Sequence, residues 1–108
     1  MAEVEIKELF LKVDKAFARE RAKDLDVIIQ IEVIDDGLYY LVIRDGNLQI
    51  FSGKAADPRI TLKAKLEDFI EIFERKLKPE TAFFQGRLLA QGDIHFAMKM
   101  ADLFSRLD

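Results

Sequence analysis

The chain has 108 residues, of which 50% are hydrophobic and 34% are charged, with 20 acidic against 17 basic side chains and no cysteine. This length predicts a single domain, residues 1–108, that can bury a substantial apolar core. The slight acidic excess argues against nucleic acid as a partner, because such binding needs a strongly basic face. Without cysteine, a disulfide framework, a thiol nucleophile and a thiolate metal site are all excluded.

The opening segment does not resemble a targeting signal. "MAEVEIKELF" begins with acidic residues and lacks the basic segment that precedes the apolar run of a secretory signal. No apolar stretch in the sequence approaches the length of about 18 residues that a membrane-spanning helix needs. We therefore expect a cytoplasmic protein.

The first half of the chain predicts one helix followed by four strands. Apolar residues recur at helical spacing from Ala2 to about Ala22. Short apolar runs, the first and last of them alternating with polar residues, are typical of strands. The predicted strands cover residues 27–34, 38–44, 48–52 and 59–65.

Two turns divide the first three of these strands into hairpins. Residues 35–37 and 45–47 each contain an Asp-Gly pair, which tolerates the positive φ of a tight turn. In the strand before the first turn, alternate residues are apolar, so we expect Gln30 and Glu32 on the opposite, polar side.

The second half predicts helices around one last strand. Residues 66–77 have helical periodicity without a capping side chain in front, and Pro79 marks the exit from that helix. A short strand over 87–91 follows, and Asp93 is placed to cap a final helix, Ile94–Leu107. Hairpin-joined strands with segregated helices indicate an α+β fold with a single five-stranded, mostly antiparallel sheet.

The final helix carries more apolar surface than a helix covering a sheet requires. One apolar stripe about 100° wide is enough for that purpose, and this helix has two. The first stripe is Ile94, Ala97, Met98, Ala101 and Phe104, and the second is Phe96, Met100, Leu103 and Leu107. The surplus predicts contact with another helix, a partner chain or an apolar cavity, since Met and Phe are common in adaptable pockets. Ordinary core packing is the alternative.

The segment "ADPRITL…LEDFIEIFERKLKPETAFFQGRLLAQGDIHFAMKM" resembles the sterol carrier protein type of lipid-transfer domain. That family has an Ala-Asp before a strand, an acidic pair with Phe on a helix, and then "KLxPxxAFxxGxLxxxGD" before an apolar helix. The likeness is specific from Ala56 to Leu103 and rests on element order alone before that. The matching positions are Ala56, Asp57, Asp68, Phe69, Lys76, Leu77, Pro79, Ala82, Phe83, Gln85, Gly86, Leu88, Gly92 and Asp93.

The resemblance implies a five-stranded sheet with helices packed on one face around an apolar cavity. Such a cavity would hold a sterol, a fatty acyl chain, an isoprenoid or a phospholipid, without any catalytic step. Phe83 and Phe84 would be wall or gate residues, and Gln85 would either orient a ligand headgroup or satisfy backbone groups of the turn. The residues expected to line the site, or to be ordinary core, are Phe69, Ile72, Phe73, Phe83, Phe84, Gln85, Leu88, Phe96, Met100, Leu103 and Phe104.

Two positions depart from the family's pattern. Ala90 stands where a larger aliphatic residue is usual, and Leu89 stands where Lys is common. The smaller Ala90 would change the shape of the cavity, and an outward Leu89 would suit a patch that binds a partner.

Catalytic chemistry has little support in the sequence. The single imidazole, His95, is ten residues from Ser105 on the predicted final helix, about 15 Å along its axis, so the two cannot form a nucleophile and base. No calcium-loop spacing or phosphate-binding glycine frame is present. We therefore expect no catalytic residues, no metal, no cofactor and no enzymatic activity.

Basic residues along one side of the first helix suggest a membrane contact. Lys12, Lys15, Arg19 and Lys23 follow a helical spacing that would suit transient docking on an anionic bilayer. The alternative is a solvated face, which the acidic residues among them favour.

The main function expected is therefore binding, and transfer, of an apolar lipid. The alternative is an interaction or dimerisation module, in which the surplus apolar surface closes on a second copy or on an enzyme of a lipid pathway. Native mass measurement separates the two, because only the first predicts a co-purified ligand.

Overall fold

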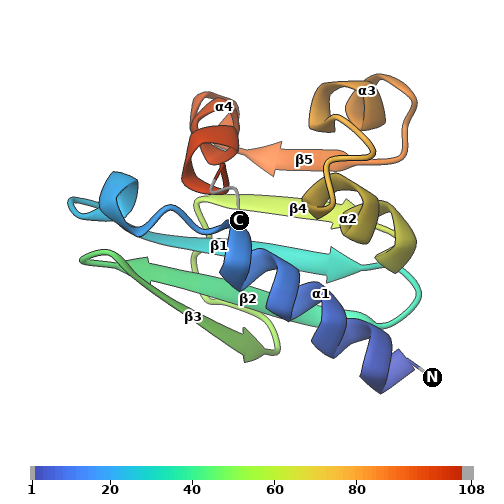
Figure 1. Ribbon diagram of the computed structural model, residues 1–108, viewed down its shortest axis with the longest axis horizontal. Helices are drawn as coiled ribbons and strands as arrows, with labels where there is room; N and C mark the ends of the chain where they lie inside the picture. The colour runs from blue at the N-terminus through green and yellow to red at the C-terminus, as the bar shows by residue number, and fades with distance from the viewer. Residues whose placement is uncertain (1, 106–108) are drawn as a thin grey trace.

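A computed structural model describes residues 2–105, and the side chains from Ile6 onward. The elements in chain order are α1 (Ala2–Ala16), the 3₁₀ helix η1 (Arg19–Ala22), β1 (Asp26–Val33), β2 (Gly37–Arg44), β3 (Asn47–Ser52), β4 (Ile60–Ala64), α2 (Leu66–Phe73), α3 (Pro79–Phe84), β5 (Leu89–Gly92) and α4 (Ile94–Leu103) (Figure 1).

The five strands form one mixed sheet in the order β3-β2-β1-β4-β5. Three of the four pairings are antiparallel, and β1 with β4 is the parallel one, with Ile29 opposite Ile60. The prediction of a mostly antiparallel five-stranded sheet in an α+β domain is confirmed. Because β4 pairs with β1 while β3 lies at the edge beyond β2, the chain between β3 and β4 must cross one face of the sheet.

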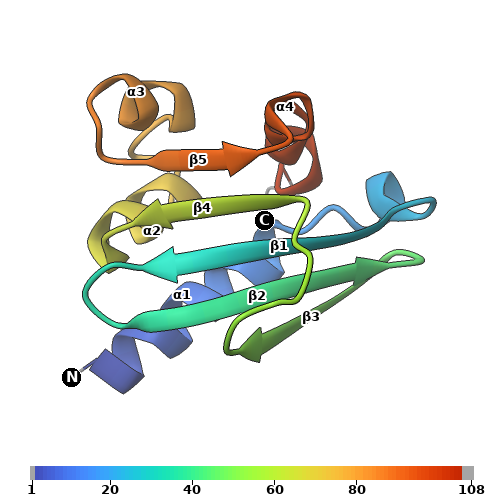
Figure 2. The same ribbon diagram turned by 180° about the vertical axis from the view of Figure 1, so that it is seen from behind.

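Helices α1 and α2 lie against one face of the sheet, and the opposite face is crossed by the β3–β4 connection (Figures 1 and 2). The alternating side chains of β1 explain this layering, since Val27, Ile29, Ile31 and Val33 are all buried. The main core therefore lies between the sheet and the helices.

The β2–β3 hairpin turns as the sequence predicts. Arg44 pairs with Asn47, so only Asp45 and Gly46 form the loop, with φ of 51° and 80°. Positive φ at both positions is the signature of the hairpin turn that matches the twist of the strands.

Gln30 lies on the opposite side of β1 from the four apolar residues, as the sequence predicts, but it is buried, at 3% exposed. The β3–β4 connection covers it, and its amide donates to the carbonyls of Tyr39 (2.9 Å) and Gly53 (3.1 Å). Its oxygen accepts from the Ala55 N–H at 2.7 Å. One buried amide thus anchors the crossing segment by satisfying three backbone groups.

Several helices are shorter than predicted. The first helix ends at Ala16 rather than near Ala22, and a separate 3₁₀ turn covers the last four of those residues. The second ends at Phe73, because Arg75 adopts a left-handed backbone (φ 64°) that stops the helix before Leu77. The final helix ends at Leu103 instead of Leu107, which lies outside the described residues, and the last strand is 89–92 rather than 87–91.

A residue of the distant β1–β2 turn caps α2. Lys65 offers no capping side chain, but the carboxylate of Asp35, in the β1–β2 turn, accepts from the Leu66 N–H at 3.1 Å. A carboxylate at a helix N-terminus satisfies an otherwise free donor and complements the helix dipole.

Candidate ligand-binding site

The predicted lining residues fall into two groups. Eight of the eleven contribute to the core between the sheet and helices α2 and α4, and three are exposed on α3 and just after it. The core group consists of Phe69, Leu88, Phe96, Leu103 and Phe104, which are buried, and Ile72, Phe73 and Met100, which are partly buried. All eight side chains are apolar, so they contact one another through dispersion.

Phe104 connects the parts of this group. Its ring lies 5.6 Å from that of Phe73 on α2, edge to face, and 5.8 Å from that of Phe17, which follows α1. Phe104 follows α4 directly and has non-helical backbone angles. It is therefore buried, whereas Ile94 and Met98, which the sequence places on the same apolar stripe, are exposed. The sequence did not indicate Phe17 as part of this group, because its spacing places it on a separate helix.

The two apolar stripes of α4 have different environments. Phe96, Met100 and Leu103 of the second stripe face the core. In the first stripe Ile94 and Met98 are exposed, at 53% and 76%. The surplus surface of this helix therefore faces away from the core.

The expected turn after Pro79 is a short helix, α3, which begins at this proline. Proline suits the first helical position because its missing N–H has no partner there in any case. The helix places Phe83 and Phe84 outward, 51% and 85% exposed, with their rings 6.0 Å apart. Gln85 follows at the exposed C-terminal end and accepts a long hydrogen bond from Arg87, at 3.4 Å.

An ion pair fixes the segment after α3 to α2. The guanidinium of Arg87 donates through Nε (3.0 Å) and Nη2 (2.5 Å) to Oδ1 of Asp68, which is 5% exposed, and approaches Glu71 at 3.4 Å. The hydrogen bond to Asp68 raises the pKa of Arg87 above its ordinary value. The sequence does not indicate this role for either residue, since no local pattern links two positions that are 19 residues apart.

The start of α4 is held by its predicted cap. Oδ1 of Asp93 accepts from the Phe96 N–H at 3.0 Å, which confirms the capping role. Its Oδ2 accepts from Nε of Arg59 at 3.0 Å, and the Arg59 guanidinium lies 4.9 Å above the Phe96 ring. The helix N–H and then Arg59 hold the pKa of Asp93 below its ordinary value.

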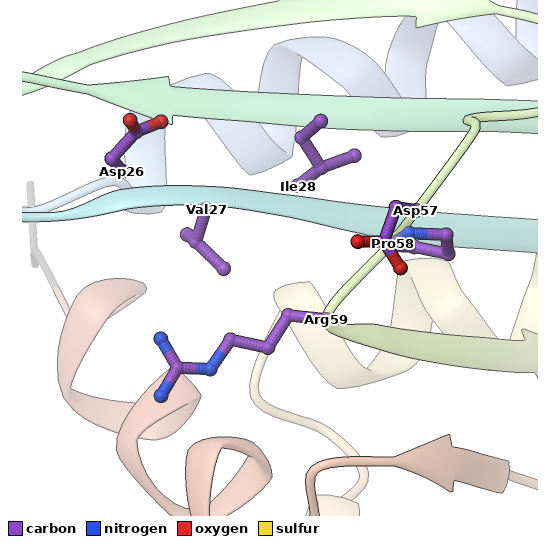
Figure 3. A pocket seen from close by; sticks show the side chains of 6 residues that line it. All are labelled: Asp26, Val27, Ile28, Asp57, Pro58 and Arg59. Carbon is purple, nitrogen blue, oxygen red and sulfur yellow. The ribbon is translucent and has the colours of Figure 1, made fainter.

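Two open cavities of about 310 Å³ lie elsewhere on the molecule. One lies between the start of β1 and the residues before β4, where the Arg59 side chain extends toward α4 (Figure 3). The other lies at the β1–β2 turn, and its lining includes Glu32 and Lys63. None of the eleven predicted residues lines either of these two cavities.

Other site types find no support among residues 2–105. No group of three or more His, Asp or Glu side chains there is arranged to hold a metal ion. No described helix is both long and apolar enough to cross a membrane.

The sequence matches the family model described as "SCP-2 sterol transfer family" over residues 6–105. The chain belongs to this family. The resemblance found in residues 56–103 therefore extends over nearly the whole chain, including α1 and the first three strands.

Known proteins agree with this assignment. Hydroxysteroid dehydrogenase-like protein 2 of Rattus norvegicus is 26% identical over 106 residues, which cover 95% of this chain and 20% of that protein. The crystal structure of sterol carrier protein 2 like 2 from Aedes aegypti has a TM-score of 0.70 at 20% identity, covering 95% of this chain and 99% of that one. A solution structure of the palmitated protein from the same mosquito has a TM-score of 0.67 at 22% identity, covering 98% and 97%.

These likenesses differ in what they establish. The two mosquito structures show the fold, which is that of sterol carrier protein 2 domains. The chain spans about a fifth of the length of the rat relative, so the match is to one part of a larger protein.

Proposed function

We propose that this domain binds one apolar lipid between the sheet and helices α2 and α4, and transfers it without covalent chemistry. Membership of a lipid-transfer family supports the class of ligand. The observation that carries the proposal is the group of eight apolar side chains, five buried and three partly buried, that α2, α4 and the residues next to them contribute to the core. Each methylene moved from water into such an environment contributes roughly 0.8 kcal/mol.

The ligand would enter by displacing side chains that now fill the interior. Phe73, Met100 and Phe104 are the residues suited to this, because two are only partly buried and the third follows the end of α4. Met adapts to irregular shapes through three rotatable bonds, and a Phe ring swings about two. The site would therefore open on binding.

Such an interior selects ligands by length and shape. The eight core side chains are all apolar and would not recognise a headgroup. Sterols, fatty acyl chains, isoprenoids and phospholipid tails therefore all remain ligands of the proposed class. A palmitated protein has this fold, and so we propose a fatty acyl chain as the first ligand to test. Exposed Gln85 stays a candidate for contact with the headgroup.

We predict that Met100→Trp lowers the affinity for a fluorescent fatty acid about tenfold or more, because the indole occupies the space that the chain needs. Met98→Trp is the matched control, since Met98 lies on the same helix but is 76% exposed. Equilibrium titration of both delipidated variants measures the difference. Equal affinities of the two variants would place the ligand outside the α2–α4 interior.

A second candidate function is an interaction module that serves a larger enzyme. It is favoured by one observation, that matching relatives contain this domain as about a fifth of a longer protein. Analytical ultracentrifugation distinguishes it, because a ligand-free, obligate dimer supports the module and a monomer with bound lipid supports the carrier.

A further inference from the structure

The strand β3 forms one edge of the sheet and has a free side. Its only neighbour in the sheet is β2, and no described strand or helix runs along its outer edge (Figures 1 and 2). The other edge strand, β5, has four residues, whereas β3 has six. Among the described strands, β3 is therefore the longer edge at which another strand can add to this sheet.

The β2–β3 hairpin fixes which backbone groups of β3 are free. Its two-residue turn makes Arg44 and Asn47 a hydrogen-bonded pair, and the register runs to the end of the strand without a bulge. Alternate residues of β3 therefore bond to β2, namely Asn47, Gln49 and Phe51. The N–H and C=O groups of the residues between them point to the free edge, where no described residue bonds them, namely Leu48, Ile50 and Ser52.

β3 lacks the features that usually keep an edge strand from pairing with another chain. Edge strands are protected by charged side chains, by proline, by a bulge or by very short length. The sequence of β3, NLQIFS, contains no charged residue and no proline. Its Leu48 and Ile50 side chains are partly buried against the core, so the side of the sheet that α1 covers is apolar up to this edge. An added strand extends that apolar layer.

An aromatic pair lies beside the same edge on the opposite face of the sheet. Phe51 is 42% exposed, and its ring stacks on that of Tyr40 in β2, with 5.4 Å between the ring centroids. Neither ring belongs to the core between the sheet and the helices. The free backbone groups of β3 are thus accompanied by an apolar surface that the described chain leaves partly uncovered.

We infer that β3 pairs with β3 of a second copy, antiparallel and about a two-fold axis at Ile50, in a weak and concentration-dependent dimer. Leu48 then faces the partner's Ser52, and Ile50 faces the partner's Ile50, so that all three free residues of each copy pair and each pair exchanges two hydrogen bonds. On the other face, Phe51 lies diagonal to the partner's Phe51 at about 7–8 Å, a distance that aromatic side chains span.

A second copy suits this edge better than an unrelated strand. The added strand needs a free edge, no charge, and apolar side chains at alternate positions on the side that α1 covers, and β3 itself has all three. A two-fold pair also closes, because each copy then uses its longer free edge. Strands of six residues bury less than the roughly 1,200 Å² of a stable interface, so we expect the monomer at low micromolar concentration.

Sedimentation velocity between about 10 µM and about 1 mM tests the dimer with the full chain. We expect the mass to rise toward that of two chains as the concentration increases. Phe51→Lys should weaken this association about tenfold or more, because it removes the aromatic contact and puts like charges on the diagonal. Phe84→Lys is the matched control, since Phe84 is 85% exposed on α3, and it should associate like the unaltered chain.

The backbone pairing is tested apart from the side chains. Ser52→Pro removes an N–H that points to the free edge and leaves the bonds to β2 in place, so it should weaken dimerisation about tenfold. Ser52→Ala keeps this N–H and should dimerise like the unaltered chain. In hydrogen exchange, the amides of Leu48, Ile50 and Ser52 should become protected as the concentration rises, whereas those of Gln49 and Phe51 should be protected at every concentration.

Three results overturn the inference. A chain that stays monomeric up to about 1 mM does so, as does growth into species larger than a dimer, which a closed pair forbids. Association that Phe84→Lys abolishes and Phe51→Lys leaves intact would place the contact on α3 instead of β3.

The inference is independent of the proposed lipid binding. β3 contributes none of the eight core side chains of the candidate site, so Phe51→Lys should leave the affinity for a fatty acid unchanged. A chain that dimerises but loads no fatty acid contradicts the lipid binding alone. A chain that loads the fatty acid and never dimerises contradicts the β3 pairing alone.

Discussion

Gly92→Ala is expected to lower the free energy of unfolding by about 3–5 kcal/mol. Gly92 ends β5 with φ of 117°, a conformation that a side chain rarely tolerates. An added Cβ would lie 2.6 Å from the carbonyl oxygen of Arg59, which accepts the Asp93 N–H at 3.0 Å. Relief of this clash requires β5 to move from β4, and the cap of α4 moves with it. Urea denaturation followed by circular dichroism measures the change.

Gly53→Ala is the control that separates strain from clash. Gly53 has nearly the same φ, 113°, but no atom lies within 4 Å of a Cβ placed there. It should cost about 1–2 kcal/mol, from backbone strain alone. If the two variants lose the same free energy of unfolding, the close approach of Gly92 to Arg59 does not contribute to the loss.

Phe96→Ala is expected to destabilise the delipidated domain by about 3–5 kcal/mol. Phe96 is 2% exposed and is the largest of the fully buried side chains. Its loss removes the transfer free energy of the ring, leaves a cavity, and takes away the surface over which the Arg59 guanidinium lies. Denaturant unfolding of ligand-free protein measures this cost.

Phe84→Ala provides the matched comparison, because Phe84 is the same residue type at 85% exposure. It should change stability by less than about 0.5 kcal/mol. A large loss with Phe84→Ala would show that the ring packs against the domain, and would contradict its assignment to a free surface.

Local signals predicted the strands, the hairpins and the cap of α4. Asp45 and Gly46 set the β2–β3 turn by themselves, and Asp93 bonds a residue three positions away. Such features depend only on neighbours in the sequence, and the periodicity that marks β1 and β4 is equally local.

Features that depend on long-range contacts could not be predicted from the sequence. Gln30 is buried because a segment more than 20 residues away crosses it, and α2 is capped by Asp35, 31 residues before Leu66. No periodic pattern of apolar residues in the sequence indicates either contact. Arg75 ends α2 in a conformation that usually belongs to glycine, so the stop signal was absent from the residue type.

The sequence indicated which residues form the candidate site better than it indicated where they lie. The apolar residues of α2 and α4 were identified from their spacing, and most of them meet in one core. The proline before Phe83 was taken to mark a turn, whereas it begins α3 and thereby turns both rings outward. Whether these rings also contact a ligand stays a prediction.

Native mass spectrometry of the freshly purified chain, combined with organic extraction, tests whether the domain carries a lipid. We expect a monomer carrying one apolar lipid, whose mass matches a compound in the extract. We also expect the same species, once delipidated, to take up one fatty acid. A chain that is empty as isolated and refuses the fatty acid would contradict lipid binding by this domain.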